Sequence, residues 1–191
     1  DQTVEGYLTY RADTPKRLER LMALAPDMAM AQILKGYLMM LAFKLAAVPA
    51  ARTALAAAAP LMANASDRER AHQAALTAWI AGDVERTLQI WEDIMIAHPR
   101  DVLAFRLHHF TAFWLGSADR MGRAVEGVLP AYAKDEPVYA ALLACKAFAF
   151  EELGRFDEAE LARVASLLRR RSRKTSPFAA VPKSLLRSHW V

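Results

Sequence analysis

Residues 68–101 read RERAHQAALTAWIAGDVERTLQIWEDIMIAHPRD, and this stretch decides the fold. A first helix is expected at its start, where Ser66 and Asp67 can cap the first turn. Gly82 frees the backbone for a left-handed turn residue, and Pro99 prevents the second helix from continuing. The stretch therefore predicts one helix–turn–helix unit.

The side chains of this unit suit two helices packed together. Trp91 is the large residue of the second helix, and small residues of the first helix stand where the two would touch: Ala71, Ala74, Ala75 and Ala78. Gly116 follows Gly82 by 34 residues, which is the period of the tetratricopeptide repeat, a helix–turn–helix unit that stacks into a solenoid. We therefore predict an all-α fold, a tetratricopeptide-like solenoid of helical hairpins, or alpha-alpha superhelix.

The same pattern continues in both directions along the chain. Gly154 opens the segment GRFDEA, which is typical of the turn in such a repeat. An alanine- and leucine-rich helical pair precedes Ser66, with helices expected over 28–46 and 49–62. We expect a repeat solenoid over 1–165 and a basic tail or capping helix over 166–191. The expected units are about 1–27, 28–66, 67–101, 102–136 and 137–171.

Composition limits the function classes. A length of 191 residues suits one domain, and the single cysteine, Cys145, excludes an internal disulfide framework. All 21 acidic residues lie at or before Glu160, whereas 163–191 carry eight Lys and Arg, so a mildly acidic body precedes a basic end. The longest uncharged run, 53–66, is shorter than the roughly 20 residues of a membrane span. We expect a cytoplasmic protein that does not span a membrane.

Several segments resemble the tetratricopeptide repeat protein 38 family. They are RERAH at 68–72, AWIAGD at 78–83, WEDI at 91–94, HPRD at 98–101, LKGYL at 34–38, PAAR at 49–52 and FWLG at 113–116. The likeness covers about 5–165, so the chain is similar to the N-terminal half of such a protein. It implies a repeat fold and no particular biochemical activity, because the family is described by its repeats.

No arrangement of residues predicts catalysis. His108 and His109 are adjacent, so on a helix they point about 100° apart and cannot chelate one metal together, although His72 could approach them across the stack. Cys145 is expected to be a small core residue rather than a nucleophile. We predict no enzyme, no cofactor and no metal; a substrate-modifying enzyme with His72 in its site is the weakest alternative.

The predicted concave groove is the more informative surface. The first helices of the units should line it, and their exposed positions would form an aromatic and apolar stripe: Met39, Phe43, His72, Leu76, Trp79, Arg106, Phe110, Phe113, Ala144 and Phe148. Two interpretations compete, since such a stripe is a large patch to leave in water. Either further chain, the C-terminal segment or a second subunit covers it, or it receives an apolar helix or peptide whose polar ends Arg106 and His72 would fix.

The basic tail offers another interpretation. Its cluster consists of Arg169, Arg170, Arg171, Arg173 and Lys174, which could contact nucleic acid or an acidic membrane surface. Charge runs near termini are usually solvated, and we favour that interpretation. We therefore predict a non-catalytic protein–protein interaction scaffold that binds a peptide or helix in the concave groove. The alternative is nucleic-acid or acidic-surface binding through the tail, and a homo-oligomer stays open.

Overall fold

The computed structural model describes residues 2–8 and 11–172, and every regular element in these ranges is helical. The α-helices are α1 (Gln2–Leu8), α2 (Thr14–Leu24), α3 (Ala29–Met40), α4 (Val48–Ala58), α5 (Asp67–Ile80), α6 (Val84–Ala97), α7 (Val102–Trp114), α8 (Ala118–Val128), α9 (Pro137–Glu152) and α10 (Phe156–Ser172). Short 3-10 helices are η1 (Leu45–Ala47), η2 (Ala59–Met62) and η3 (Leu129–Ala131). The all-α prediction is confirmed.

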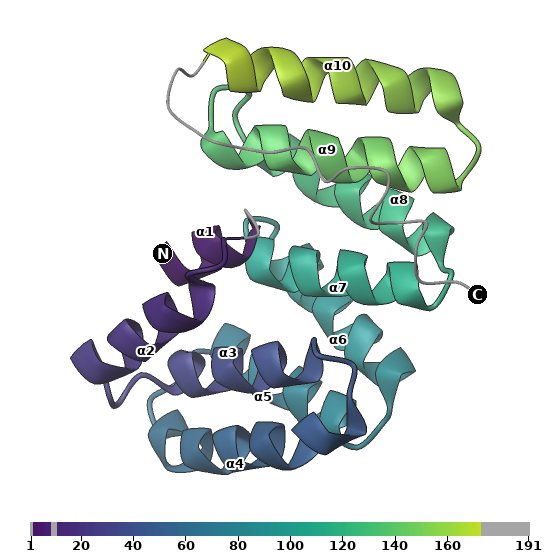
Figure 1. The fold of residues 1–191 in the computed structure, drawn as a ribbon. Coiled ribbons are helices and arrows are strands. Elements are labelled where there is room, and N and C mark those ends of the chain that lie inside the picture. Colours follow the sequence, from purple (N-terminus) through teal and green to yellow (C-terminus); the bar gives the residue numbers. More distant parts are fainter. Residues whose placement is uncertain (1, 9–10, 173–191) are drawn as a thin grey trace.

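Successive helices pack against one another in chain order. Helix α3 lies against α4, α5 against α6, α7 against α8, and α9 against α10, and neighbouring pairs meet where α6 contacts α7 and α8 contacts α9. In Figure 1 the ribbons α7 and α9 lie in front of α6 and α8, α1 lies beside the start of α7, and α2 leads from α1 to the start of α3. This order places α3, α7 and α9 on one side of the molecule.

Local capping fixes where the central helices begin. Ser66 Oγ accepts a hydrogen bond from the backbone N–H of Glu69, and the Glu69 carboxylate accepts one from the Ser66 N–H at 2.8 Å. This reciprocal capping box starts α5, whereas Asp67 is the first residue inside the helix. Asp83 and Asp101 cap α6 and α7 by a single hydrogen bond each: the carboxylate accepts from the backbone N–H three residues later.

Glycines with positive φ end the first helices of three pairs. Gly82, Gly116 and Gly154 have φ of 85°, 69° and 72°, and they follow α5, α7 and α9. At Gly82 the backbone N–H bonds to the Trp79 carbonyl at 3.0 Å, which closes the end of α5. The left-handed turn expected at Gly82 is therefore present, and glycine adopts it without the steric penalty of a Cβ atom.

The upstream hairpin differs from the sequence expectation. A first helix was expected over 28–46, but α3 ends at Met40, and Phe43 turns the chain with a φ of 48°. The 3-10 turn η1 then leads into α4, which has Pro49 in its first turn. Proline suits the first turn of a helix, as expected for a second helix that starts near Pro49.

One apolar core runs through the stack. Its largest fully buried side chains come from most of the helices between α3 and α9 and include Trp91, Tyr37, Phe105, Phe150, Leu76, Leu88, Leu107 and Met121. Gly36 on α3 is buried, and a Cβ atom placed on it would lie 2.5 Å from a methyl carbon of Leu76 on α5. The missing side chain at Gly36 lets α3 and α5 approach closely.

Candidate functional site

Five aromatic rings, from the turn after α3 and from α7 and α9, form a continuous surface, which we call the aromatic patch: Phe43, Phe110, Phe113, Trp114 and Phe148. The ring of Phe43 lies 5.9 Å from that of Phe110 and 5.6 Å from that of Trp114, measured between centroids. Phe113 continues the series at 5.7 Å from Trp114 and 5.0 Å from Phe148. Phe43 and Trp114 each keep 49% of their surface exposed. The patch is therefore assembled from three helical pairs and stays partly open.

Phe43 enters the patch through an unusual backbone conformation. It is the single non-glycine residue with positive φ in the part of the chain that the structure describes, and left-handed geometry costs a bulky residue about 1–2 kcal/mol. Its amide N–H bonds to the Met40 carbonyl at 3.0 Å, so the turn is anchored to the end of α3. The ring gains contacts with Trp79, Phe110 and Trp114 in return.

The end of α7 supplies the opposite side of the patch. Phe113 and Trp114 are the last residues of this helix, Leu115 is 51% exposed, and Gly116 then turns the chain. Successive helical residues point about 100° apart, so Phe113 reaches α9 while Trp114 reaches Phe43. Trp114 was not among the expected groove residues. Two adjacent aromatic residues just before a turn glycine were the signal for it in the sequence.

The structure separates the expected groove residues into two groups. Partly or well exposed are Met39, Phe43, Phe110, Phe113, Ala144 and Phe148, whereas His72, Leu76, Trp79 and Arg106 are buried. Helix α5 explains much of this difference, because α3 and Phe43 cover the side of α5 that was expected to face the groove. The four buried side chains do not contribute to an exposed surface of the folded chain.

His72 belongs to a buried polar network between α3, α5 and the start of α7. Its Nε2 lies 2.9 Å from Asp101 Oδ2, and the Tyr37 hydroxyl donates to the His72 carbonyl at 2.8 Å. Arg68 donates to Asp101 from the partly exposed edge at 2.5 Å, and the indole of Trp91 donates to the Tyr37 oxygen at 3.2 Å. Because His72 and Asp101 are almost fully buried, this network joins α3, α5, α6 and the start of α7.

Asp101 carries the charge of this network. Burial alone would raise the pKa of its carboxyl. The hydrogen bond and charge of His72 outweigh burial, together with hydrogen bonds from the Ala104 amide and from Arg68, and hold that pKa well below its usual range. The carboxylate also caps α7 through the Ala104 N–H at 2.9 Å. Asp101 therefore ties the start of α7 to α5.

Arg106 and His109 lie on the part of α7 that faces α1 and α9. His109 Nε2 donates to the carbonyl of Cys145 at 3.1 Å, and a guanidinium nitrogen of Arg106 lies 3.9 Å from the Cys145 sulfur. Burial and the nearby Arg106 charge lower the pKa of His109 to about 3. Burial raises the pKa of Tyr7 on α1 to about 12, and the nearby charge of Arg106 offsets part of that rise. Helix α1 thus covers this end of α7.

His108 points to the other side of α7. Its Nε2 donates to Glu92 on α6 at 2.9 Å, and Arg120 on α8 forms ion pairs with Glu92 and Glu85. Burial lowers the pKa of His108 more than the Glu92 hydrogen bond raises it. His108 and His109 therefore face different helices, and in residues 2–8 and 11–172 no group of three metal-ligating side chains is present.

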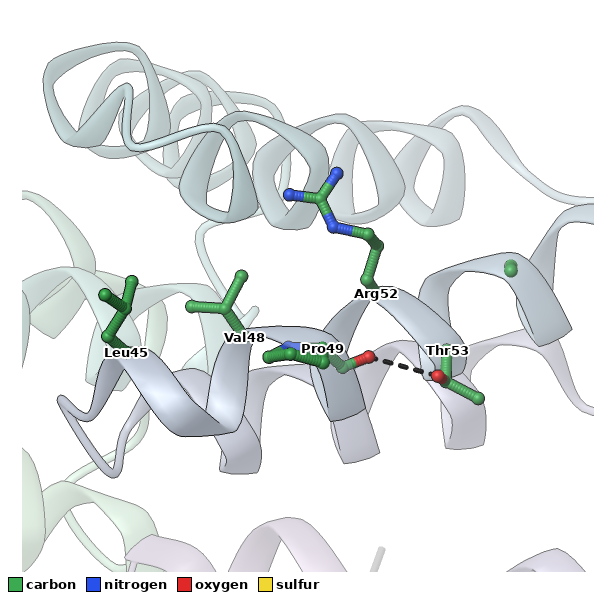
Figure 2. Close-up of a pocket in the computed structure, with 6 residues that line it drawn as sticks. Leu45, Val48, Pro49, Arg52 and Thr53 are labelled. Carbon is green, nitrogen blue, oxygen red and sulfur yellow. Dashed lines mark hydrogen bonds between the residues drawn. The ribbon is translucent and has the colours of Figure 1, made fainter.

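A shallow depression of about 640 Å³ lies on the outer side of α4. Figure 2 shows Leu45, Val48 and Arg52 extending from the helix toward the same side, with Thr53 bonded back to the Pro49 carbonyl. Arg52 is the one ionisable side chain in its lining, so acid–base or metal chemistry lacks partners here.

The same region contains the one described helical stretch, Leu45–Met62, that is long and apolar enough to cross a bilayer. Length and composition alone are weak evidence, so the absence of a membrane span stays a prediction.

The basic cluster is mostly outside the part that can be described. Arg173 and Lys174 lie beyond residue 172, and for Arg170 and Arg171 the structure gives the helical backbone of α10 alone. Arg169 packs its guanidinium 5.3 Å from the Tyr139 ring centroid and donates to the Lys134 carbonyl at 3.4 Å. This arginine joins α10 to α9 rather than pointing freely into solvent.

No family model matches the chain, and no solved structure matches it.

Proposed function

We propose that this protein is a non-catalytic protein-interaction scaffold that binds an apolar peptide or helix of a partner on the aromatic patch. The observation that carries the proposal is the patch itself, in which Phe43 and Trp114 stay half exposed although they lie among packed rings. Exposed apolar clusters of this kind mark interaction sites more often than ordinary surface. The tetratricopeptide solenoid and the likeness to the tetratricopeptide repeat protein 38 family belong to the same proposal.

Packing in chain order supports the solenoid part of the proposal. Each helical pair contacts the next along the chain, and glycine turns end the first helices of three pairs. Repeat units of this kind bury a shared core and present a preformed surface along one side. A preformed surface binds without a large ordering cost, which suits a scaffold.

The backbone strain at Phe43 supports the binding site. A non-glycine residue keeps a left-handed backbone conformation only where its surroundings hold it, and such residues cluster at functional sites. Here the strain places an aromatic side chain, still half exposed, beside Trp114. Packing alone would not need a phenylalanine that stays so open to water.

The exposed area predicts the size of the effect. An aromatic side chain has roughly 150–250 Å² to bury, so half of Trp114 leaves about 100 Å² for a partner. At about 25 cal/mol per Å², covering that area contributes about 2.5 kcal/mol as an upper value. Trp114→Ala should therefore weaken peptide binding by about 2 kcal/mol, or roughly 30-fold in Kd.

Peptide display provides the test. Random 12-residue peptides would be selected on the immobilised full chain, and the Kd of the best binders would be measured by calorimetry for the parent and for Trp114→Ala. Leu24→Ala is the matched control, since Leu24 is 85% exposed on α2, away from the patch. We expect apolar peptides whose affinity falls with Trp114→Ala and is unchanged with Leu24→Ala. Equal loss in both variants, or none in either, would disprove the proposal.

A further inference from the structure

Part of the aromatic patch and the neighbouring Leu115 stay open to water. Within the described ranges, Phe43, Trp114 and Leu115 each leave about half of their surface in water, and they lie next to one another. Contiguous exposed apolar surface favours association, so a segment that covers it would be stabilised there. The chain itself contains a segment with suitable chemistry.

That segment is 178–190, which lies outside the described residues. Its sequence, FAAVPKSLLRSHW, places apolar and aromatic residues among a few basic ones: Phe178, Val181, Leu185, Leu186 and Trp190, with Lys183 and Arg187. It contains no acidic residue. Its apolar and aromatic side chains could therefore pack on the aromatic patch, and its basic side chains could pair with carboxylates beside it.

The rim of the patch supplies the opposite charge. Glu151 and Glu152 follow Phe148 by three and four residues on α9, so they lie one turn beyond it on the same side of the helix. Both are exposed; Glu151 lies close enough to Arg163 on α10 to help raise the pKa of that guanidinium, and Glu152 takes part in none of the ion pairs within the described part of the chain. Lys183 and Arg187, which flank the two leucines, could pair with these carboxylates.

The segment can reach the patch. Ser166 on α10 donates to the Ala140 carbonyl of α9 at 2.8 Å, so the end of α10 lies near the start of α9. From Ser172 back to Ser166, and then from Ala140 to Phe148, is 14 helical positions, or about 21 Å at 1.5 Å each. The tether of residues 173–177 lets Phe178 lie up to about 20 Å from Ser172 when extended, and the segment itself covers the remaining distance to the exposed rings.

We infer that residues 178–190 bind the aromatic patch within the same molecule and compete with the partner. This inference rests on the proposed function, because it assigns a competitor to the same surface. A short tether gives an effective concentration on the order of a millimolar, so a segment that binds with a Kd of about 0.1 mM in trans would cover the patch about nine-tenths of the time. An outside peptide should then bind about tenfold more weakly than to an open patch.

Photo-crosslinking tests the contact directly. The full chain would carry Trp114→p-benzoylphenylalanine, be irradiated over a hundredfold range of concentration, and be digested for mass spectrometry. We expect crosslinks from position 114 to 178–190 in the monomer band at every concentration. Leu24→p-benzoylphenylalanine is the control and should give none. Crosslinks to this segment in a dimer band alone would mean that a second copy supplies it, and would overturn the inference, as would their absence.

A second measurement uses the affinity of an outside peptide. The probe is a fluorescent synthetic peptide with the sequence of residues 176–191, titrated into the parent and into Leu185→Asp/Leu186→Asp by anisotropy. We expect about tenfold tighter binding to the variant, because its own segment no longer occupies the patch. Ser184→Asp/Ser188→Asp adds the same two charges without removing the leucines, and should change the affinity much less than the leucine variant does. Equal affinity for parent and leucine variant would count against the inference.

The two proposals can fail separately. If displayed peptides bind through Trp114 while position 114 gives no crosslink to 178–190, the inference is wrong and the proposed function stands. If the crosslink forms but no displayed peptide binds the open-patch variant, the segment is the resident occupant and the scaffold proposal is wrong.

Discussion

The two buried histidines of α7 should make the fold sensitive to mild acid. His109 is almost fully buried, and burial with the Arg106 charge holds its pKa near 3, well below the ordinary value of 6.5. In the unfolded chain the imidazole takes up a proton as the pH falls below 6.5, whereas in the folded chain it stays neutral. The stability contributed by the neutral His109 is therefore complete above about pH 6.5 and is lost as the pH falls toward 3.

The size of the loss follows from the difference between the two pKa values. At pH 5 the solution is 1.5 pH units below the pKa of 6.5 that the imidazole has in the unfolded chain. Each unit lowers the free energy of unfolding by 1.36 kcal/mol, so His109 alone accounts for a loss of about 2 kcal/mol. His108 shifts in the same direction because it is buried, so it adds to this loss. A loss of about 2 kcal/mol is large against the few kcal/mol of net stability of most domains.

Urea unfolding at pH 7.5 and pH 5.0, followed by circular dichroism, measures this loss. The parent is compared with His109→Gln, in which an amide can still donate to the Cys145 carbonyl, and with His98→Gln, which changes an exposed histidine. We expect the parent and His98→Gln to lose about 2 kcal/mol more than His109→Gln between the two pH values. That difference is a shift of about 1 M in urea midpoint. If all three proteins lose the same stability, burial does not keep His109 neutral and the reasoning is refuted.

Two further predictions concern the framework. Gly82→Val should lower the free energy of unfolding by about 2 kcal/mol in thermal melts. The cause is backbone strain at a φ of 85° alone, since a Cβ atom there would meet no neighbour. Gly127→Ala, inside α8, is the control and should be neutral or stabilising. Asp101→Asn should lower stability by about 2–3 kcal/mol at pH 7, because Arg68 and His72 lose a charged acceptor, and a urea midpoint equal to the parent's would contradict the network. The stability that this carboxylate contributes is complete above its usual pKa near 3.8, and it is lost at lower pH.

Local sequence signals predicted the helices and turns well where the physics is local. Ser66 and Glu69 stand three residues apart, so their capping box forms whatever packs around it. Gly82 adopts left-handed geometry because no Cβ atom opposes it. In the α3–α4 hairpin the helix expected over 28–46 was too long, since α3 ends at Met40. Phe43 takes a conformation that its residue type disfavours, and tertiary contacts with Trp79 and Trp114 hold it there.

Burial was the part that the sequence could not supply. The same helical spacing that put His72 and Trp79 in the expected groove also fits a helix covered from that side, and the position of α3 decides between the two. Trp79→Ala would therefore test packing, since Trp79 lies 5.2 Å from Trp91 in the core. Trp114 is the better probe of binding because it is half exposed.

By itself the sequence determined the helical class, the order of the helices and the turns that separate them, because hydrophobic period, caps and turn glycines act over a few residues. Only the tertiary structure decided which aromatic side chains stay open to water. That choice depends on how closely α3 approaches α5 across Gly36, and on rings brought together from helices far apart in the chain. Contacts between distant residues carry no local pattern, so the aromatic patch appears only when the helices are packed.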